Sequence, residues 1–249
     1  MPLPHRLVNT LLKGNLMASF FESVKDSFVG TFVTEDRWKM FAEGLGNTLL
    51  IAFCATLIGV VIGALVAIVK TVNKQTGKLK VLSAVCEFYT TLIRGTPVVV
   101  QLLISYNLIF TWSTRPVLVG IIAFGINSGA YVSEIMRAGI NAVDIGQTEA
   151  GRSLGLSSST TMWYIVIPQA IKNILPAVGN EFISLLKETS VIGYIGTLDL
   201  TKAATRVMSR TMDAYFPYIS IALIYLAIVC IMNFFVKKLE RRLAKSDRG

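Results

Sequence analysis

Three charged residues, Glu181, Lys187 and Glu188, lie within a mainly apolar stretch over residues 170–197. A charge near the centre of a membrane helix costs roughly 2.5–3.5 kcal/mol, so it needs a partner, a wet cavity or a place near the interface. The two carboxylates are seven residues apart, nearly two helical turns, and therefore share one helix face with Lys187 to one side. This pattern fits a polar site that binds an ammonium group.

The same charges also permit a structural interpretation. The carboxylates could form ion pairs with Arg94 or Arg137 and so tie this stretch to its neighbours. Arg94 is also a candidate for the lining of a solute path. Asn127, in an earlier apolar stretch over 116–138, is another such candidate, although it equally fits an interhelical hydrogen bond. Both interpretations stay open at this point.

A second group of candidates lies in the loop before residue 170. Asp144 can accept hydrogen bonds from the first free N–H groups of a helix, and Gln147, three residues later, completes a capping-box pattern. Gly155 suits a left-handed C-terminal stop. The spacing predicts a helix of about two or three turns.

The residues along this predicted helix are suited to contact with another protein. Gly146, Ala150 and Gly151 are small enough to let a partner approach the backbone, and Glu149 and Arg152 offer opposite charges. The pattern fits a docking element, but a plain connector between two spans would also be helical.

Catalytic and metal sites are not indicated. His5 is the only histidine, and the three cysteines, Cys54, Cys86 and Cys230, lack the spacing of metal ligands. No nucleophile, base and orienting group occur at a plausible spacing. A Gly-x-x-x-x-Gly-Lys-Ser/Thr segment is also missing, so we predict no nucleotide site, no cofactor and no enzymatic activity on this chain.

The composition indicates a membrane protein. Hydrophobic residues make up 53% of the chain and charged residues 16%, against roughly 45–50% and about 25% in soluble domains. The net charge of +9 comes mainly from residues at the ends of apolar runs, which favours orientation signals over nucleic-acid binding. Five spans are predicted, over residues 44–69, 81–112 with a break at Pro97, 116–138, 170–197 and 214–236.

Basic residues orient these spans. They cluster after the first and the fifth span: Lys70, Lys74, Lys78, Lys80, Lys237, Lys238, Arg241, Arg242 and Lys245. This pattern places both clusters, the loop after the third span and the C-terminus in the cytoplasm, and the N-terminus outside. Residues 7–32 predict an amphipathic helix at the outer surface. In the first span Ala55, Gly59, Gly63 and Ala67 form a small-residue stripe for either a moving or a static helix contact.

The loop resembles the EAA loop of binding-protein-dependent ABC importers. That pattern is Glu-Ala-Ala, three residues, Gly, nine residues and Ile-x-Leu-Pro, and here it reads Glu149-Ala150-Gly151, Gly155 and Ile165-Val166-Ile167-Pro168. All gaps match, and the two departures, Gly151 and Ile167, preserve small or aliphatic character. Further segments are similar to the polar amino acid permeases of that superfamily, over residues 44–243: Arg94-Gly95-Thr96-Pro97 with Gln101-Leu102, Tyr131 before Glu134 and Arg137, and Asn180-Glu181 with Lys187-Glu188.

The resemblance implies an all-α integral membrane permease of about five transmembrane helices with a cytoplasmic coupling helix. It would lie in a bacterial plasma (inner) membrane and pair with an identical or closely related permease. The pair would bind two copies of an ATP-binding cassette ATPase and receive a polar amino acid from an extracellular or periplasmic binding protein. ATP and Mg²⁺ would bind to the ATPase. The residues implied in ATPase coupling are Asp144, Gln147, Glu149, Ala150, Gly151, Arg152, Gly155, Ile165, Ile167 and Pro168.

The chain divides into an external or interfacial segment over 1–43, a permease domain over 44–238 with the EAA loop at 139–168, and a cytoplasmic tail over 239–249. Two other functions fit the residues. One is an ion-coupled secondary transporter or channel in which Glu181 and Glu188 carry protons or cations. The other is a membrane scaffold that docks a partner through the loop and transports nothing.

Overall fold

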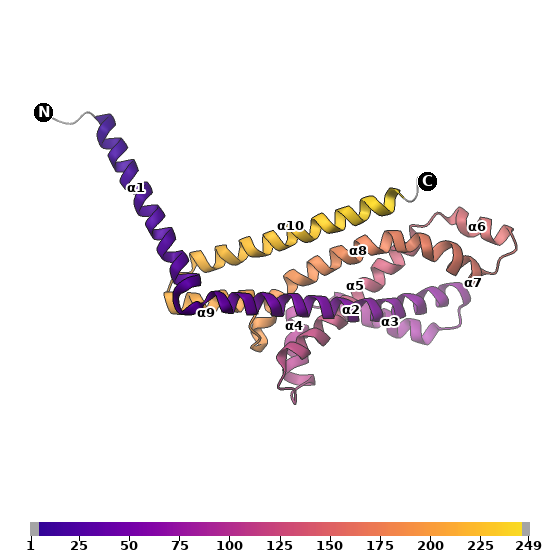
Figure 1. Cartoon of the computed structure of the whole chain (residues 1–249). Coiled ribbons are helices and arrows are strands. Elements are labelled where there is room, and N and C mark those ends of the chain that lie inside the picture. Colours follow the sequence, from indigo (N-terminus) through magenta and orange to yellow (C-terminus); the bar gives the residue numbers. More distant parts are fainter. Residues whose placement is uncertain (1–4, 246–249) are drawn as a thin grey trace.

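The computed structural model describes residues 5–245. Residues 246–249 of the predicted tail and residues 1–4 of the predicted N-terminal segment lie outside the described part. Within that part the chain is helical and contains no strand (Figure 1). The α-helices are α1 (His5–Phe28), α2 (Trp38–Thr76), α3 (Lys80–Arg94), α4 (Val98–Ile104), α5 (Pro116–Asn141), α6 (Ile145–Ser153), α7 (Ser158–Thr161), α8 (Ile167–Glu188), α9 (Leu200–Thr211) and α10 (Tyr215–Lys245).

Shorter helical turns connect these elements. Three are π-helical, η1 (Val29–Val33), η3 (Ser105–Ile109) and η4 (Met162–Val166), and two are 3₁₀, η2 (Thr34–Asp36) and η5 (Thr189–Ile195). The helix predicted at the N-terminus is present as α1, although its apolar residues do not form one continuous stripe. A further helix, α9, occupies a connection in which the sequence had indicated no element.

Three helices in the described chain, α2, α5 and α10, are long and apolar enough to cross a membrane. The predicted second span is broken, as expected, because α3 ends at Arg94 and α4 starts after Pro97. The two parts are bent by 106°, far more than a simple kink, so the segment is a broken span or a re-entrant loop.

The predicted fourth span, 170–197, needs correction. The α-helix over this region, α8, ends at Glu188, and the chain continues as the 3₁₀ turn η5. By length and composition α8 does not qualify as an apolar span. It packs against α5, α10 and α2, and these contacts explain why a helix with several charges is tolerated here.

The most extensive helix contact joins α2 and α5. Glycines on each helix receive side chains from the other. A Cβ on Gly59 would lie 2.6 Å from the Ser128 hydroxyl, and one on Gly129 would lie 2.7 Å from Ile62 Cγ2. Gly59 and Gly63 of the predicted small-residue stripe therefore form a close, interlocked contact with α5.

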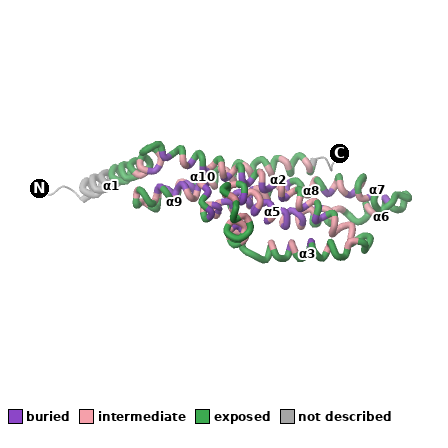
Figure 2. The backbone as a smooth tube through the Cα atoms, turned by 90° about the horizontal axis from the view of Figure 1, so that it is seen from below, coloured by how far each residue is buried: buried purple, intermediate pink, exposed green. Residues whose placement is uncertain are grey.

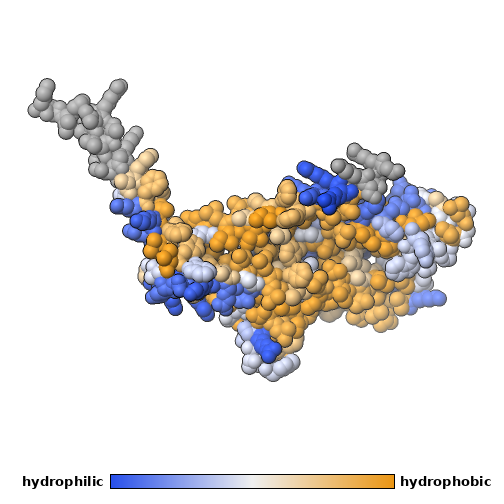
Figure 3. Space-filling model, viewed as in Figure 1, coloured by the Kyte–Doolittle hydropathy of each residue, from blue (hydrophilic) through white to orange (hydrophobic). Residues whose placement is uncertain are grey.

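Two buried clusters stabilise the bundle. One gathers α2, α4, α5, α8 and η5 around Ile51, Leu102, Phe124, Leu185 and Ile192. The other joins α2, α9 and α10 through residues that include Phe41, Leu200 and Ile221. By contrast, α10 is mostly exposed (Figure 2), and apolar surface covers the middle of the molecule, with polar residues toward its ends (Figure 3). This distribution matches a helix bundle surrounded by lipid.

Candidate functional site

The predicted short helix of the loop is α6, and it is nine residues long. Its start is capped as predicted, because Asp144 Oδ1 accepts a hydrogen bond from the Gly146 N–H at 2.7 Å. It ends at Ser153 and is followed by Gly155, whose φ of +81° is the left-handed conformation that glycine adopts without strain. The N–H of Leu156 donates to the Gly151 carbonyl at 3.1 Å and closes the stop. Both ends of α6 are thus fixed by local sequence.

Gln147 has a different contact from the predicted one. Its Oε1 accepts a hydrogen bond from Gln169 Nε2 at 3.3 Å, so the side chain connects α6 to the first turns of α8. Gln169 Nε2 also donates to the Ile165 carbonyl at 3.0 Å. Gln147, which the spacing predicted to cap α6, therefore links α6 to α8 instead.

Gly151 also requires a correction. It is buried, and a Cβ at this position would lie 2.8 Å from Thr161 Cγ2 and 3.1 Å from Ile165 Cδ1. The small side of α6 at this residue therefore faces the chain's own α7 and η4, not a partner. This contact gives a physical reason for glycine in place of the third alanine of the EAA pattern.

The outer side of α6 is open. Glu149, Ala150 and Arg152 are exposed, and Arg152 Nη1 reaches Ser158 Oγ at 3.4 Å. Two large apolar side chains flank these residues, Ile145 at 74% and Leu154 at 81% exposure. The sequence analysis did not name these two residues. Their large apolar side chains at the two ends of a polar helix are the sequence feature that could have identified them.

The remaining loop residues lie where η4 meets α8. Ile165 belongs to η4 and Ile167 begins α8, and both are half-buried. Pro168 is exposed in the first turn of α8, directly after the π-helical turn η4. Ile167 also faces an apolar cavity of about 800 Å³ between α2, α5 and α8.

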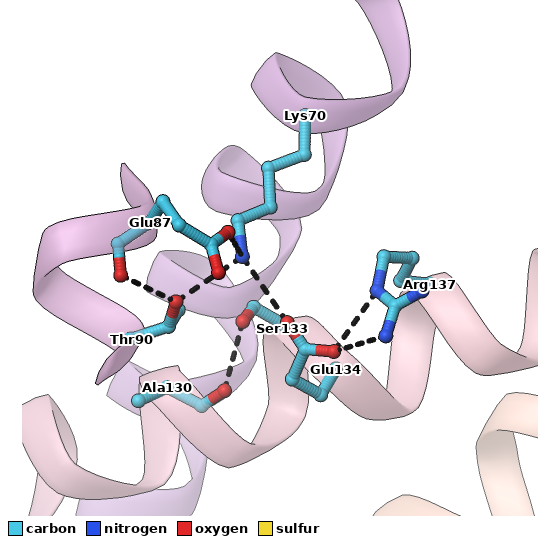
Figure 4. Close-up of polar contacts among 7 residues, drawn as sticks. All are labelled: Lys70, Glu87, Thr90, Ala130, Ser133, Glu134 and Arg137. Carbon is cyan, nitrogen blue, oxygen red and sulfur yellow. Dashed lines mark hydrogen bonds and ion pairs between the residues drawn. The ribbon is translucent and has the colours of Figure 1, made fainter. Parts of the chain in front are cut away.

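A cluster of charges connects α2, α3 and α5 (Figure 4). Lys70 Nζ lies 2.7 Å from Glu87 Oε2 and 3.1 Å from Glu134 Oε1, and Arg137 Nη2 lies 2.5 Å from Glu134 Oε2. The side chain of Lys70 is only 11% exposed. Sequence reasoning treated Lys70 as a loop lysine, because the apolar run ends before it, whereas α2 continues to Thr76.

Arg94 lies with this cluster. Together with Thr90 and Thr91, the charged residues line a polar cavity of about 480 Å³. The guanidinium of Arg94 stacks over the ring of Tyr131 at 5.5 Å. Among the described residues, neither Arg94 nor Arg137 forms an ion pair with Glu181 or Glu188, so the predicted structural ion pairs with those arginines are not formed.

A second polar group lies on α5 and α8. Ser128 Oγ donates to Glu181 Oε1 at 3.2 Å, and the neighbouring Asn127 donates from Nδ2 to Gln101 Oε1 at 3.0 Å. Asn127 is buried, and its Oδ1 has no partner among the described atoms. Glu188, seven residues after Glu181 on α8, is half-buried.

The predicted path residues therefore do not form a single cluster. Asn127 and Glu181 are linked because Asn127 adjoins Ser128, which donates to Glu181, and Glu188 lies about two turns further along α8. Lys187 is exposed on α8, and Arg94 belongs to the separate cluster around Lys70. No group of histidine, cysteine and acidic side chains in the described chain could hold a metal ion.

Comparison with known proteins defines the class. Residues 59–245 match the family described as binding-protein-dependent transport system inner membrane component. The chain is 41% identical over 213 residues to the putative glutamine transport system permease protein GlnP of Rickettsia bellii, covering 82% of this chain and 93% of that protein. It is 37% identical over 208 residues to the arginine transport system permease protein ArtQ of Bacillus subtilis, covering 82% and 93%.

A solved structure agrees with these relatives. The crystal structure of an amino acid ABC transporter with histidines contains a chain that is 43% identical and superposes with a TM-score of 0.78, covering 85% of this chain and 98% of that one. The chain belongs to the family of inner membrane components of binding-protein-dependent transport systems. The fold is that of an ABC importer permease, as the sequence predicted.

Proposed function

We propose that this chain is the transmembrane permease subunit of an ATP-driven importer that carries polar amino acids across a bacterial inner membrane. The observation that carries the proposal is α6, a short helix with fixed ends that presents exposed apolar and charged side chains. Relatives named for glutamine and arginine transport support the substrate class.

The arrangement of the helices supports an orientation. The loop between α2 and α3 contains Lys78 and is flanked by Lys74 in α2 and Lys80 in α3; it lies at the same end of the bundle as α6 and the C-terminal part of α10 (Figure 1). The basic C-terminal part of α10 contains Lys237, Lys238, Arg241 and Arg242. We assign this end to the cytoplasm and the opposite end, with α1 and α9, to the outside.

The proposed partners are assigned to the two ends of the bundle. The exposed side of α6 docks into a cleft of an ATPase subunit, which binds ATP and Mg²⁺, and two such ATPase copies serve a pair of identical or closely related permeases. An extracellular or periplasmic binding protein delivers the solute at the other end. Closure of the ATPase pair moves α6, and the contact of Gln147 with Gln169 transmits that movement to α8.

The solute path in this proposal passes the polar group on α5 and α8. Glu181 and Glu188 supply negative charge for an ammonium group, and Asn127 supplies a neutral amide. Lys187 is exposed on α8 beside Glu188, and Arg94 belongs to the cluster around Lys70.

Reconstituted vesicles test the function. The permease is inserted with its ATPase and binding protein, and uptake of labelled glutamine, arginine and cystine is measured in competition with charged, amide and sulfur amino acids. We expect uptake that requires ATP. Gly155→Val is the variant expected to lose coupling, because a β-branched residue at φ +81° is strained. It should insert into the membrane normally but bind less ATPase than the control variant Gly155→Asn.

Two results would contradict the proposal. Uptake that survives ATP depletion but collapses with an uncoupler would indicate an ion-coupled transporter. ATP hydrolysis without accumulation of any amino acid tested would indicate a scaffold.

A further inference from the structure

The break between α3 and α4 leaves a backbone carbonyl without its usual partner. In a continuous helix the N–H of residue 97 would donate to the carbonyl of Ile93, but Pro97 has no N–H. Gln101, one turn into α4, fills this position: its Nε2 lies 2.7 Å from the Ile93 carbonyl oxygen and 3.0 Å from the Thr96 carbonyl oxygen. Thr96 Oγ1 satisfies the preceding carbonyl, that of Leu92, at 2.9 Å.

The other end of the same amide reaches α5. Gln101 Oε1 accepts a hydrogen bond from Asn127 Nδ2 at 3.0 Å. Two carbonyl acceptors on one side and an N–H donor on the other fix the orientation of the Gln101 amide. The next residue of α5, Ser128, contacts Glu181 of α8. The Gln101 side chain of α4 thus contacts both the end of α3 and Asn127 of α5.

We propose that Gln101 is a positioning residue that holds the bend at Pro97 in one geometry and fixes the broken span to α5 through Asn127. Its Nε2 replaces the missing Pro97 N–H, and its Oε1 sets the Asn127 amide so that Nδ2 is occupied and Oδ1 is left free. The structural part of the proposal stands on these contacts. Its consequence for transport rests on the proposed function, in which the solute path runs along the part of α5 that Gln101 contacts through Asn127.

The experiment separates the two ends of the amide. Spin labels are placed on exposed positions in a background with Cys54, Cys86 and Cys230 replaced by alanine. One pair, at residues 85 and 108, reports on the bend, and a second pair, at residues 100 and 118, reports on the contact of α4 with α5; Val85, Leu108, Val100 and Leu118 are all exposed. Distance distributions are measured on the full chain in lipid nanodiscs.

Three variants and a control give distinct expectations. Gln101→Leu removes both contacts and should broaden both distributions. Gln101→Glu retains acceptor oxygens for Asn127 but loses the amide N–H groups, so it should broaden mainly the first. Asn127→Leu should broaden only the second. Asn107→Leu removes another amide from the same segment, one that donates only within it to Leu103, and should change neither.

Transport supplies the second readout. In vesicles with the ATPase, Gln101→Leu should raise the KM for uptake about tenfold, as expected when the buried Asn127 amide loses its hydrogen-bond acceptor, while basal ATP hydrolysis stays within twofold. Distributions for Gln101→Leu and Gln101→Glu as narrow as that of Asn107→Leu would overturn the positioning role. Broadened distributions with no amino acid uptake even in the wild type would instead refute the proposed function and leave the positioning role intact.

Discussion

Gly151 shows how one missing methyl group can set the position of α6, the helix proposed to dock the ATPase. The residue is buried against Thr161, so α6 lies closer to α7 and η4 than any other amino acid would allow. The exposed Glu149 and Ala150 on the outer side keep their places only if this inner contact is preserved.

Gly151→Ala should therefore displace α6, because its new Cβ would lie 2.8 Å from Thr161 Cγ2. We expect a loss of about 1–3 kcal/mol in packing and less ATPase retained on affinity purification of the permease. Thr161→Ser removes the Cγ2 that causes the clash, so the double variant should recover most of the retained ATPase. Equal recovery of ATPase by Gly151→Ala and the wild type would show that the inner contact does not control docking.

At the scale of elements, ion pairs connect α2, α3 and α5. The exposure of each carboxylate indicates how much its pair contributes to stability. Glu87 is 68% exposed and Glu134 is 19% exposed, although both pair with Lys70. An exposed pair contributes about 0–1 kcal/mol. The pair with Glu134 loses less to solvent screening and is the stronger connection.

Lys70→Met should consequently lower the thermal stability of the permease more than Glu87→Gln does. We expect about 1–3 kcal/mol for the first variant, because Glu134 then retains only Arg137, and under about 1 kcal/mol for the second. Thermal unfolding of both variants in detergent measures this order, and Lys74→Met, at an exposed position, is the control. A larger loss for Glu87→Gln would reverse the ranking.

Helix α9 begins with a buried cap. Asp199 accepts hydrogen bonds from the N–H groups of Thr201 and Lys202, each at 3.0 Å, and burial raises the pKa of its carboxyl above the usual range. The unfolded carboxyl ionises near pH 3.9. Because the folded pKa is the higher one, the contribution of this residue to stability falls as the pH rises from about 4 through the folded pKa.

Asp199→Asn should abolish this fall, since the amide oxygen still caps α9 without carrying a charge. Asp199→Ala should instead cost about 0.5–2 kcal/mol at acidic pH, where the wild-type cap is neutral, because both hydrogen bonds are lost. Melting temperatures of the three proteins measured across pH test these expectations. An Asn variant whose stability declines in parallel with the wild type would contradict them.

Local signals predicted elements better than connections between them. The ends of α6 depend on Asp144 and Gly155, whose effects are confined to neighbouring residues, and both were predicted. The break at Pro97 was predicted for the same reason, but its 106° bend and the role of Gln101 depend on a helix elsewhere in the chain. Lys70 was missed because its carboxylate partners are distant in sequence.

For the whole molecule, the loop between α2 and α3, the C-terminal part of α10 and α6 share one end of the bundle, and α9 lies at the other (Figure 1). Single cysteines at residues 154 and 212 test the proposed orientation, because Leu154 and Met212 are 81% and 87% exposed. An impermeant thiol reagent added to intact spheroplasts should modify residue 212 and reach residue 154 only after permeabilisation. The reverse pattern would invert the orientation.

The interlocked glycines of α2 and α5 also limit how this protein can evolve. Gly59 faces Ser128 and Gly63 faces Val132, while Gly125 and Gly129 face Ile58 and Ile62 in the opposite direction. Any gain in side-chain volume on one helix must be matched by a loss at the facing position. Across an alignment of relatives, these four pairs should therefore covary, with larger residues at one position accompanied by smaller residues at the other.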